Sequence, residues 1–91
     1  MEQKTVTLHN GLGLHARPAS LFVQTANRFA ADIRVEKDGR EVSAKGILGL
    51  LSLAAKQGST ISIKALGEQE AEAVTALAAL VESGFEESAA G

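Results

Sequence analysis

The chain has 91 residues, which suffices for one compact domain and leaves no room for a second core. Cysteine is absent, which excludes disulfides, thiolate nucleophiles and cysteine-based metal sites. A formal net charge of −2 gives no overall basic field, so we expect no nucleic-acid partner.

The apolar stretches 47–55 and 76–81 are much shorter than the roughly 20 residues needed to cross a bilayer, so we expect no membrane insertion. The first residues lead directly into an alternating segment and do not resemble a signal peptide. We therefore expect a cytoplasmic protein.

The first third of the chain predicts a strand, a glycine loop and a helix. Residues 5–8 alternate between threonine and apolar residues, as in a strand with Val6 and Leu8 on its buried face. Two glycines interrupt this pattern in 9–13, which indicates a loop. From Pro18 onward, apolar residues recur at intervals of three and four and predict the inner face of an amphipathic helix: Ala19, Phe22, Val23, Ala26, Phe29 and Ala30.

The next segment predicts a β-hairpin. Residues 32–37 and 40–43 both alternate between polar and apolar side chains. The Asp38-Gly39 pair between them is a strong signal for a tight turn, so we expect the two runs to pair antiparallel.

A second helix and a fourth strand follow. A short leucine-rich helix is predicted over 46–55, with Gly58 placed to cap its end. Residues 60–65 then alternate as a strand with Ile61 and Ile63 facing inward.

The last helix is predicted to begin after Gly67 and to end near Gly84. Glu68, Glu70 and Glu72 fall in its first turns, where carboxylates complement the positive end of a helix.

This order of elements limits the possible topologies. Two strand–helix–strand units in so short a chain favour split crossovers, in which the returning strand lies parallel to its predecessor and a third strand fills the gap. We therefore predict an α+β open-faced sandwich of order βαββαβα, with a four-stranded antiparallel sheet in the order 1-4-2-3 and three helices on one face. Residues 1–91 would form a single domain, with 86–91 as a flexible tail.

Chemically useful groups concentrate in residues 13–19, where a glycine loop enters the first helix. Pro18 suits a first helical turn, because its missing N–H would have no partner there. The backbone N–H groups of Ala16 and Arg17 then favour an anion such as a phosphoryl group at the helix start. The positive helix end also disfavours an imidazolium at His15 by about 0.3–1 kcal/mol, which favours the neutral, nucleophilic ring. Arg17 can offer paired donors to the phosphoryl oxygens.

From the residues alone, other interpretations of these side chains stay open. A histidine near a helix start is more often a surface group than a catalytic one, and Arg17, which precedes proline, can lie just before the helix and be exposed. His9 has no arginine or proline after it and is interpreted as a surface loop residue. Two histidines without a spaced carboxylate or thiol cluster are weak evidence for a metal site, so none is predicted.

At residues 13–19, Gly-Leu-His-Ala-Arg-Pro-Ala, the sequence resembles the HPr family, the histidine-containing phosphocarrier proteins of the bacterial phosphoenolpyruvate:sugar phosphotransferase system. The length and the order of elements agree with that family through about Gly84. The resemblance implies that His15 accepts phosphate on Nδ1 from Enzyme I and passes it to the sugar-specific A components, with Ala16 and Arg17 at the phosphoryl group. The protein would be a monomeric relay grouped with transferases, not itself an enzyme, and would need no cofactor.

The family also uses its second helix to dock partners, and here residues 46–53 are apolar nearly all round the helix. Leu50 and Leu53 are the expected core positions. The resemblance then implies a docking surface that comprises four side chains: Ser20, Ile47, Leu48 and Leu51. The alternative is that all the apolar side chains of this helix belong to the core.

Many members of the family carry a regulatory serine at the start of this helix, where a kinase phosphorylates it. Here that position is Gly46, which can cap a helix but offers no hydroxyl group. Ser43 lies before the helix start and Ser52 lies inside the helix, so neither replaces it. We predict that the chain lacks this switch and the catabolite control that depends on it.

Three rival functions remain open. The first is a regulatory phosphocarrier that serves non-sugar targets by the same His15 chemistry. The second is a small phosphatase in which Arg17 binds the phosphoryl group and His15 turns over, for which the loop offers only Asn10 to orient water. The third is a ligand-binding domain of similar topology, in which the motif would be coincidence.

Overall fold

A computed structural model describes residues 1–86; residues 87–91, most of the predicted tail, lie outside the described part. The elements follow the predicted order βαββαβα, with one short 3-10 turn added at the end. Their bounds are β1 (Glu2–Thr7), α1 (Ala16–Ala26), β2 (Asp32–Lys37), β3 (Arg40–Ser43), α2 (Ile47–Ser52), β4 (Thr60–Leu66), α3 (Glu70–Glu82) and η1 (Gly84–Glu86).

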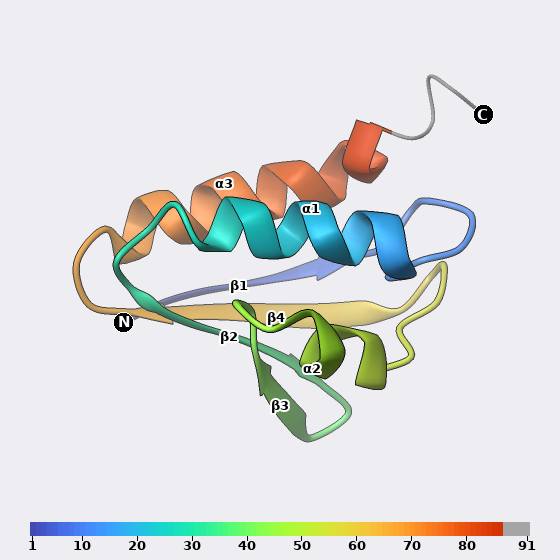
Figure 1. The fold of residues 1–91 in the computed structure, drawn as a ribbon, viewed down its shortest axis with the longest axis horizontal. Helices are drawn as coiled ribbons and strands as arrows, with labels where there is room; N and C mark the ends of the chain where they lie inside the picture. Colours follow the sequence, from blue (N-terminus) through green and yellow to red (C-terminus); the bar gives the residue numbers. More distant parts are fainter. Residues whose placement is uncertain (87–91) are drawn as a thin grey trace.

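The four strands form one antiparallel sheet in the predicted order β1-β4-β2-β3. The β2–β3 hairpin closes at Asp38 and Gly39, whose φ angles of 52° and 84° are the positive values that a two-residue hairpin turn requires. Helices α1 and α3 lie side by side over one face of the sheet, and α2 lies beside β3 and contacts α1 (Figure 1). The predicted fold class is confirmed.

The core lies between the sheet and the helices. Alternate strand residues are buried, as the sequence pattern predicts, and they pack against leucine and phenylalanine side chains of the helices. The largest completely buried side chains include Leu8, Phe22, Ile33, Leu50, Ile61, Ile63 and Leu77. No helix of residues 1–86 is both long enough and apolar enough to span a membrane.

The bounds of α1 differ from the prediction at both ends. The helix begins at Ala16, two residues before Pro18, so that Arg17 is helical and the proline still sits in the first turn. It ends at Ala26, where the regular hydrogen bonds stop: the N–H groups of Arg28 and Phe29 donate only three residues back, to the Thr25 and Ala26 carbonyls at 3.1 and 3.2 Å. The predicted inner-face residue Ala30 therefore lies beyond the helix and is exposed.

The predicted end of the second helix is also wrong. Helix α2 ends at Ser52, three residues before Ala55, and the first residue with positive φ after it is Ala54 at 51°, whereas Gly58, at 88°, lies four residues farther along. The buried Leu53 and Ala55 fix this path, since both pack into the core. Tertiary packing thus outweighs the local preference for glycine.

Helix α3 begins slightly later than predicted. Gln69, with φ 66°, is its N-cap, so Glu68 precedes the helix, whereas Glu70 and Glu72 occupy the first turn as expected.

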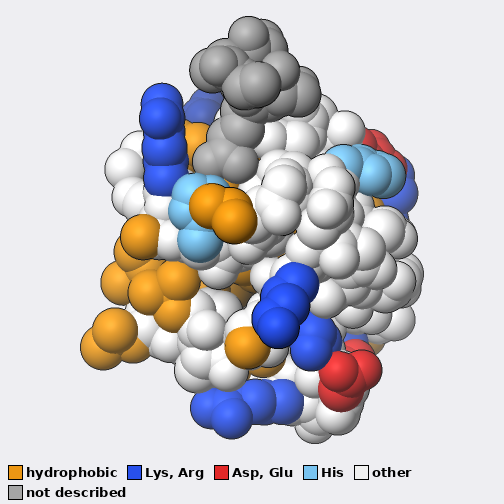
Figure 2. Space-filling model, turned by 90° about the vertical axis from the view of Figure 1, so that its right-hand side faces the viewer, with side chains coloured by type: hydrophobic (Ala, Val, Ile, Leu, Met, Phe, Trp, Pro, Cys, Tyr) orange, Lys and Arg blue, Asp and Glu red, His pale blue; other side chains and the backbone are white. Residues whose placement is uncertain are grey.

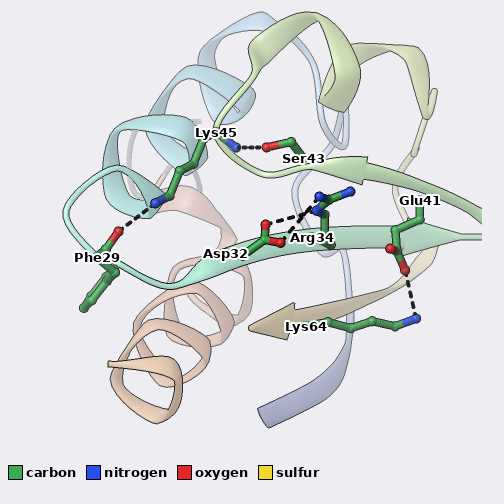
Figure 3. Close-up of polar contacts among 7 residues, drawn as sticks. All are labelled: Phe29, Asp32, Arg34, Glu41, Ser43, Lys45 and Lys64. Atoms are coloured by element: carbon green, nitrogen blue, oxygen red, sulfur yellow. Dashed lines mark hydrogen bonds and ion pairs between the residues drawn. The ribbon is translucent and has the colours of Figure 1, made fainter. Parts of the chain in front are cut away.

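Polar side chains on the strands form local pairs (Figure 3). Arg34 contacts Asp32 through Nε at 3.0 Å, and this hydrogen bond raises the pKa of the Arg34 guanidinium. Lys64 on β4 contacts Glu41 on β3 at 3.1 Å. The Nζ of Lys45 donates to the Phe29 carbonyl at 2.7 Å, which ties the segment before α2 to the segment after α1.

Candidate functional site

The start of α1 places His15 beside the backbone N–H groups of the first helical turn. His15 is the N-cap, with φ −88° and ψ −173°, and its carbonyl accepts the first helical hydrogen bond from the Ala19 N–H at 2.9 Å. The N–H groups of Ala16 and Arg17 come earlier in the chain than this first bond, so they have no acceptor within the helix. Both residues are exposed. The first turn contains no acidic side chain. A helix start of this kind suits an incoming anion.

Gly13 brings the loop before His15 into direct contact with the segment that follows α2. Its φ is +65°, and a Cβ atom on it would lie 2.3 Å from the Ala55 carbonyl oxygen and 2.6 Å from the Cα of Lys56. The next residue, Leu14, is buried, and its N–H donates to the same Ala55 oxygen at 2.8 Å. Only glycine fits here, so its presence in the motif has a steric reason.

Asn10 is a site residue whose role the sequence analysis missed. Its side-chain Nδ2 donates to the Gly13 carbonyl at 2.7 Å, and its own carbonyl accepts the Gly13 N–H at 3.1 Å. The side chain is buried inside the loop, so it is not placed to orient a water molecule as the phosphatase interpretation requires. The signal available in the sequence is an asparagine three residues before a turn glycine, a residue type that often hydrogen-bonds nearby backbone.

Three further hydrogen bonds hold the base of this loop. Leu8 exchanges hydrogen bonds with the α2–β4 connection, from its N–H to Ser59 at 2.9 Å and from the Gly58 N–H to its carbonyl at 2.9 Å. The Gln57 side chain donates to the His9 carbonyl at 3.1 Å. His9 itself is exposed in the loop, as predicted.

The predicted docking residues on α2 are exposed to different degrees. Leu48 is 80% exposed and Ile47 37%, whereas Leu51 is half-buried against the core. Leu50 and Leu53 are buried, as expected for core positions. The two exposed side chains therefore form the outer part of this surface.

The remaining predicted positions lie on α1 and at the start of α2. Ser20 is half-buried on α1, and its hydroxyl accepts a hydrogen bond from the Gln24 side chain at 3.2 Å. Gly46 is the exposed N-cap of α2, at the position predicted from the sequence.

Figure 2 shows the end of the molecule at which α1 begins. Hydrophobic side chains gather on one side of this face, next to a histidine and to lysine or arginine side chains. Besides Ile47 and Leu48, the exposed large hydrophobic residues include Leu12, which lies in the loop before His15 and is 72% exposed. The face thus combines an apolar surface with positive charge.

The protein is thus a small open-faced α+β sandwich in which a histidine lies beside a helix start that favours anions. Residues 2–83 match the family described as PTS-HPr, the PTS HPr component phosphorylation site. The chain therefore belongs to the HPr family of phosphocarriers, and the family expected from residues 13–19 is confirmed.

Relatives of two kinds match nearly the whole chain. An HPr-like protein Crh from Halalkalibacterium halodurans is 52% identical over 82 residues, which cover 90% of this chain and 98% of the relative. A phosphocarrier protein HPr from Cupriavidus necator is 41% identical over 96% of this chain and 98% of its own. The crystal structure of HPr-C-His from Thermoanaerobacter tengcongensis superposes with a TM-score of 0.93 at 49% identity, covering 96% of this chain and 98% of the other. An HPr from that organism has also been solved as a dimer.

Proposed function

We propose that this protein carries a phosphoryl group on His15 between proteins of the sugar phosphotransferase system. It accepts the group from Enzyme I and passes it to the sugar-specific A components. The observation that carries this proposal is the position of His15 at the open start of α1, beside Ala16 and Arg17, in a chain of the HPr family.

The transfer needs only groups of this chain and its partners. The Nδ1 lone pair of His15 attacks phosphorus, a nitrogen–phosphorus bond forms, and the bond to the donor breaks with its electron pair leaving on the donor. The N–H groups of Ala16 and Arg17 and the guanidinium of Arg17 stabilise the phosphoryl oxygens. The A component then attacks the same phosphorus and returns the lone pair to His15.

Partners would dock on the surface that adjoins this site. We assign its outer part to Ile47 and Leu48 and its border to Leu51 and Ser20. The exposure of Leu48 supports this assignment, because a large apolar side chain that is 80% exposed gains by burial against a partner.

Incubation with phosphoenolpyruvate and Enzyme I, followed by intact-mass analysis, tests the proposal. We expect one acid-labile phosphoryl group on the wild-type chain, none on His15→Ala and one on the control His9→Ala. Arg17→Ala should slow transfer by about 100-fold, the usual cost of removing one donor from a transition-state charge. Arg28→Ala, an exposed arginine just beyond the end of α1, is its control. Phosphate on His15→Ala would refute the assignment.

The similarity to Crh, a catabolite repression HPr of Bacillus subtilis, supports a regulatory role. The second candidate is therefore a regulatory phosphocarrier that serves non-sugar targets through His15. The acceptor distinguishes the two candidates. Purified phosphoprotein that loses its label to A components of sugar permeases supports the first; label retained against every A component of the source cell supports the second.

Regulation through a serine on α2 is not part of the proposal, because Gly46 at the helix start has no hydroxyl to phosphorylate. The kinase that modifies the family's regulatory serine should leave the wild-type chain unlabelled. We further propose that the protein acts in the cytoplasm as a monomeric single domain. Sedimentation at working concentrations tests the monomer against the dimer solved for a related HPr.

A further inference from the structure

We propose that Asn10 is a positioning residue for His15. It fixes the Gly13 carbonyl and, through that peptide, the backbone from which His15 enters α1. The inference rests on the proposed phosphorylation of His15 and adds a residue to that site.

Asn10 is the only polar side chain that is buried in the part of the chain for which the structure gives burial, residues 1–85, with 7% of its surface exposed. A buried amide is retained at a cost in desolvation and is therefore placed where its hydrogen bonds form. Its Nδ2 reaches the Gly13 oxygen at 2.7 Å, and the Gly13 N–H returns a bond to the Asn10 carbonyl at 3.1 Å. The side chain and its own backbone thus clamp the same glycine.

The peptide that joins Gly13 to Leu14 is held at both of its polar groups. Asn10 binds its oxygen, and the Ala55 carbonyl accepts its N–H at 2.8 Å. Gly13 cannot shift toward Ala55, because a Cβ-sized displacement on that side meets backbone atoms at 2.3–2.7 Å. Removal of the Asn10 amide therefore takes the shorter of two hydrogen bonds from this oxygen, so the peptide is held less firmly at one end while its N–H stays bound to Ala55.

A rotation of this peptide acts directly on His15. The His15 N–H donates to the Gly13 oxygen at 3.0 Å, the same atom that Asn10 binds. Since His15 is the N-cap, a change in the preceding peptide turns its ring relative to the N–H groups of Ala16 and Arg17. A displacement of about 1 Å in a reacting group costs on the order of 100-fold in rate.

Replacement of Asn10 should lower the turnover number without weakening the affinity for Enzyme I. The reason is that the proposed docking surface on α2 lies outside the loop that contains Asn10. Asn10→Ala removes the amide, and Asn10→Asp keeps the size of the side chain but replaces the amide donor with a carboxylate. Both should lower kcat for phosphorylation by Enzyme I by about 10- to 100-fold and leave KM within about twofold. In NMR spectra of the unphosphorylated proteins, the amide signals of Leu14 and His15 should move, whereas those of α3 should not.

A matched control separates positioning from general loss of stability. Ile33→Val removes one buried methyl group from β2, distant from the loop in sequence, and should leave kcat unchanged. Equal kcat values for Asn10→Ala, Asn10→Asp and Ile33→Val, with wild-type phosphorylation intact, would overturn the inference and leave the proposed function standing. A wild-type chain that Enzyme I cannot phosphorylate would overturn both. If Asn10→Ala does not fold, the isosteric Asn10→Asp provides the test. A kcat equal to that of Ile33→Val, with unshifted Leu14 and His15 amide signals, would overturn the inference.

Discussion

Helices α1 and α3 start at opposite ends of the molecule (Figure 1). The first turns of the two helices differ in their charged side chains. The first turn of α3 contains Glu70 and Glu72. Glu70 accepts the Gly67 N–H at 2.9 Å and pairs with the Met1 ammonium at 2.9 Å. The first turn of α1 contains no acidic residue, and the His15 side chain makes no capping bond to it.

The positive charge at the N-terminal end of a helix thus serves two different purposes in this fold. At α3 the positive helix end is matched by the chain's own carboxylates, so its effect is structural. At α1 the first turn contains an arginine and no carboxylate, and a histidine caps it, so this helix end suits an incoming anion. This contrast is what makes the start of α1, and not that of α3, the proposed phosphoryl site.

The largest effect is expected where the backbone itself holds the start of α1. Gly13→Ala should lower the free energy of unfolding by about 3 kcal/mol, because an alanine with positive φ costs about 1–2 kcal/mol and overpacking against Ala55 adds about 1–3 kcal/mol. Gly11→Ala in the same loop has nothing within 4 Å of its new Cβ and is the control. Denaturant unfolding measures both. Equal midpoints would show that the Gly13 contact is not required.

A carboxylate placed in the first turn of α1 should give that turn the negative charge that the first turn of α3 already has. Ala16→Glu is expected to slow phosphorylation of His15 by about 100-fold, since a like charge near the phosphoryl group opposes its binding. Stability should stay equal or rise by about 0.3–1 kcal/mol, because a carboxylate suits a helix N-terminus. Ala16→Gln keeps the shape without the charge and should lose far less rate. Kinetics of phosphate incorporation by both variants provide the comparison.

Docking of Enzyme I should depend on the exposed apolar residues of α2 and not on an exposed apolar residue near the start of α3. Leu48→Glu is expected to raise the KM for Enzyme I by about tenfold with little change in kcat, because it places a charge on the proposed contact surface. Leu66 is the last residue of β4, just before the turn into α3, and is 59% exposed, so Leu66→Glu is a matched apolar-to-acidic control. Equal KM values for the two variants would remove Leu48 from the interface.

The smallest effect concerns the carboxylate at α3. Hydrogen bonds from the Met1 ammonium and the Gly67 N–H hold the pKa of Glu70 below its ordinary value of 4.5. A carboxyl group with a lowered pKa stabilises the fold above that ordinary value, and the contribution is lost as the pH falls through the folded-state pKa. Glu70→Gln should therefore be slightly less stable than wild type near pH 7 and equal to it in strong acid. Glu72→Gln, in the same turn, is the control, and thermal unfolding across pH measures both.

Much of the fold could be predicted because it is specified locally. Alternation between 32 and 43, interrupted by Asp38 and Gly39, gave the bounds of β2 and β3 without error. The sheet order followed from the number and length of the connections. Helix ends were less predictable, since Ala54 adopts a left-handed conformation that its neighbours in the core impose and that its residue type disfavours.

The candidate site was predictable only in part for the same reason. His15, Arg17 and Pro18 are adjacent in sequence and at a helix start, so their local pattern carries the information. Asn10 has only a weak local signal, an asparagine three residues before a turn glycine, and the contact of Gly13 with Ala55, 42 residues farther along the chain, has none. Contacts between distant segments leave no local signal in a single sequence.

The joint between the His15 loop and the α2–β4 connection also determines when the site can form. Leu8 binds Ser59, and Leu14 binds Ala55, so the loop has its partners only after more than half of the chain has been synthesised. Pairing of β1 with β4 has the same requirement, and contacts so distant in sequence form late in folding. A ribosome-bound or truncated chain that ends before Ala55 would carry the histidine without the contacts that orient it. The proposed phosphorylation of His15 should therefore be slower on such a chain than on the full one.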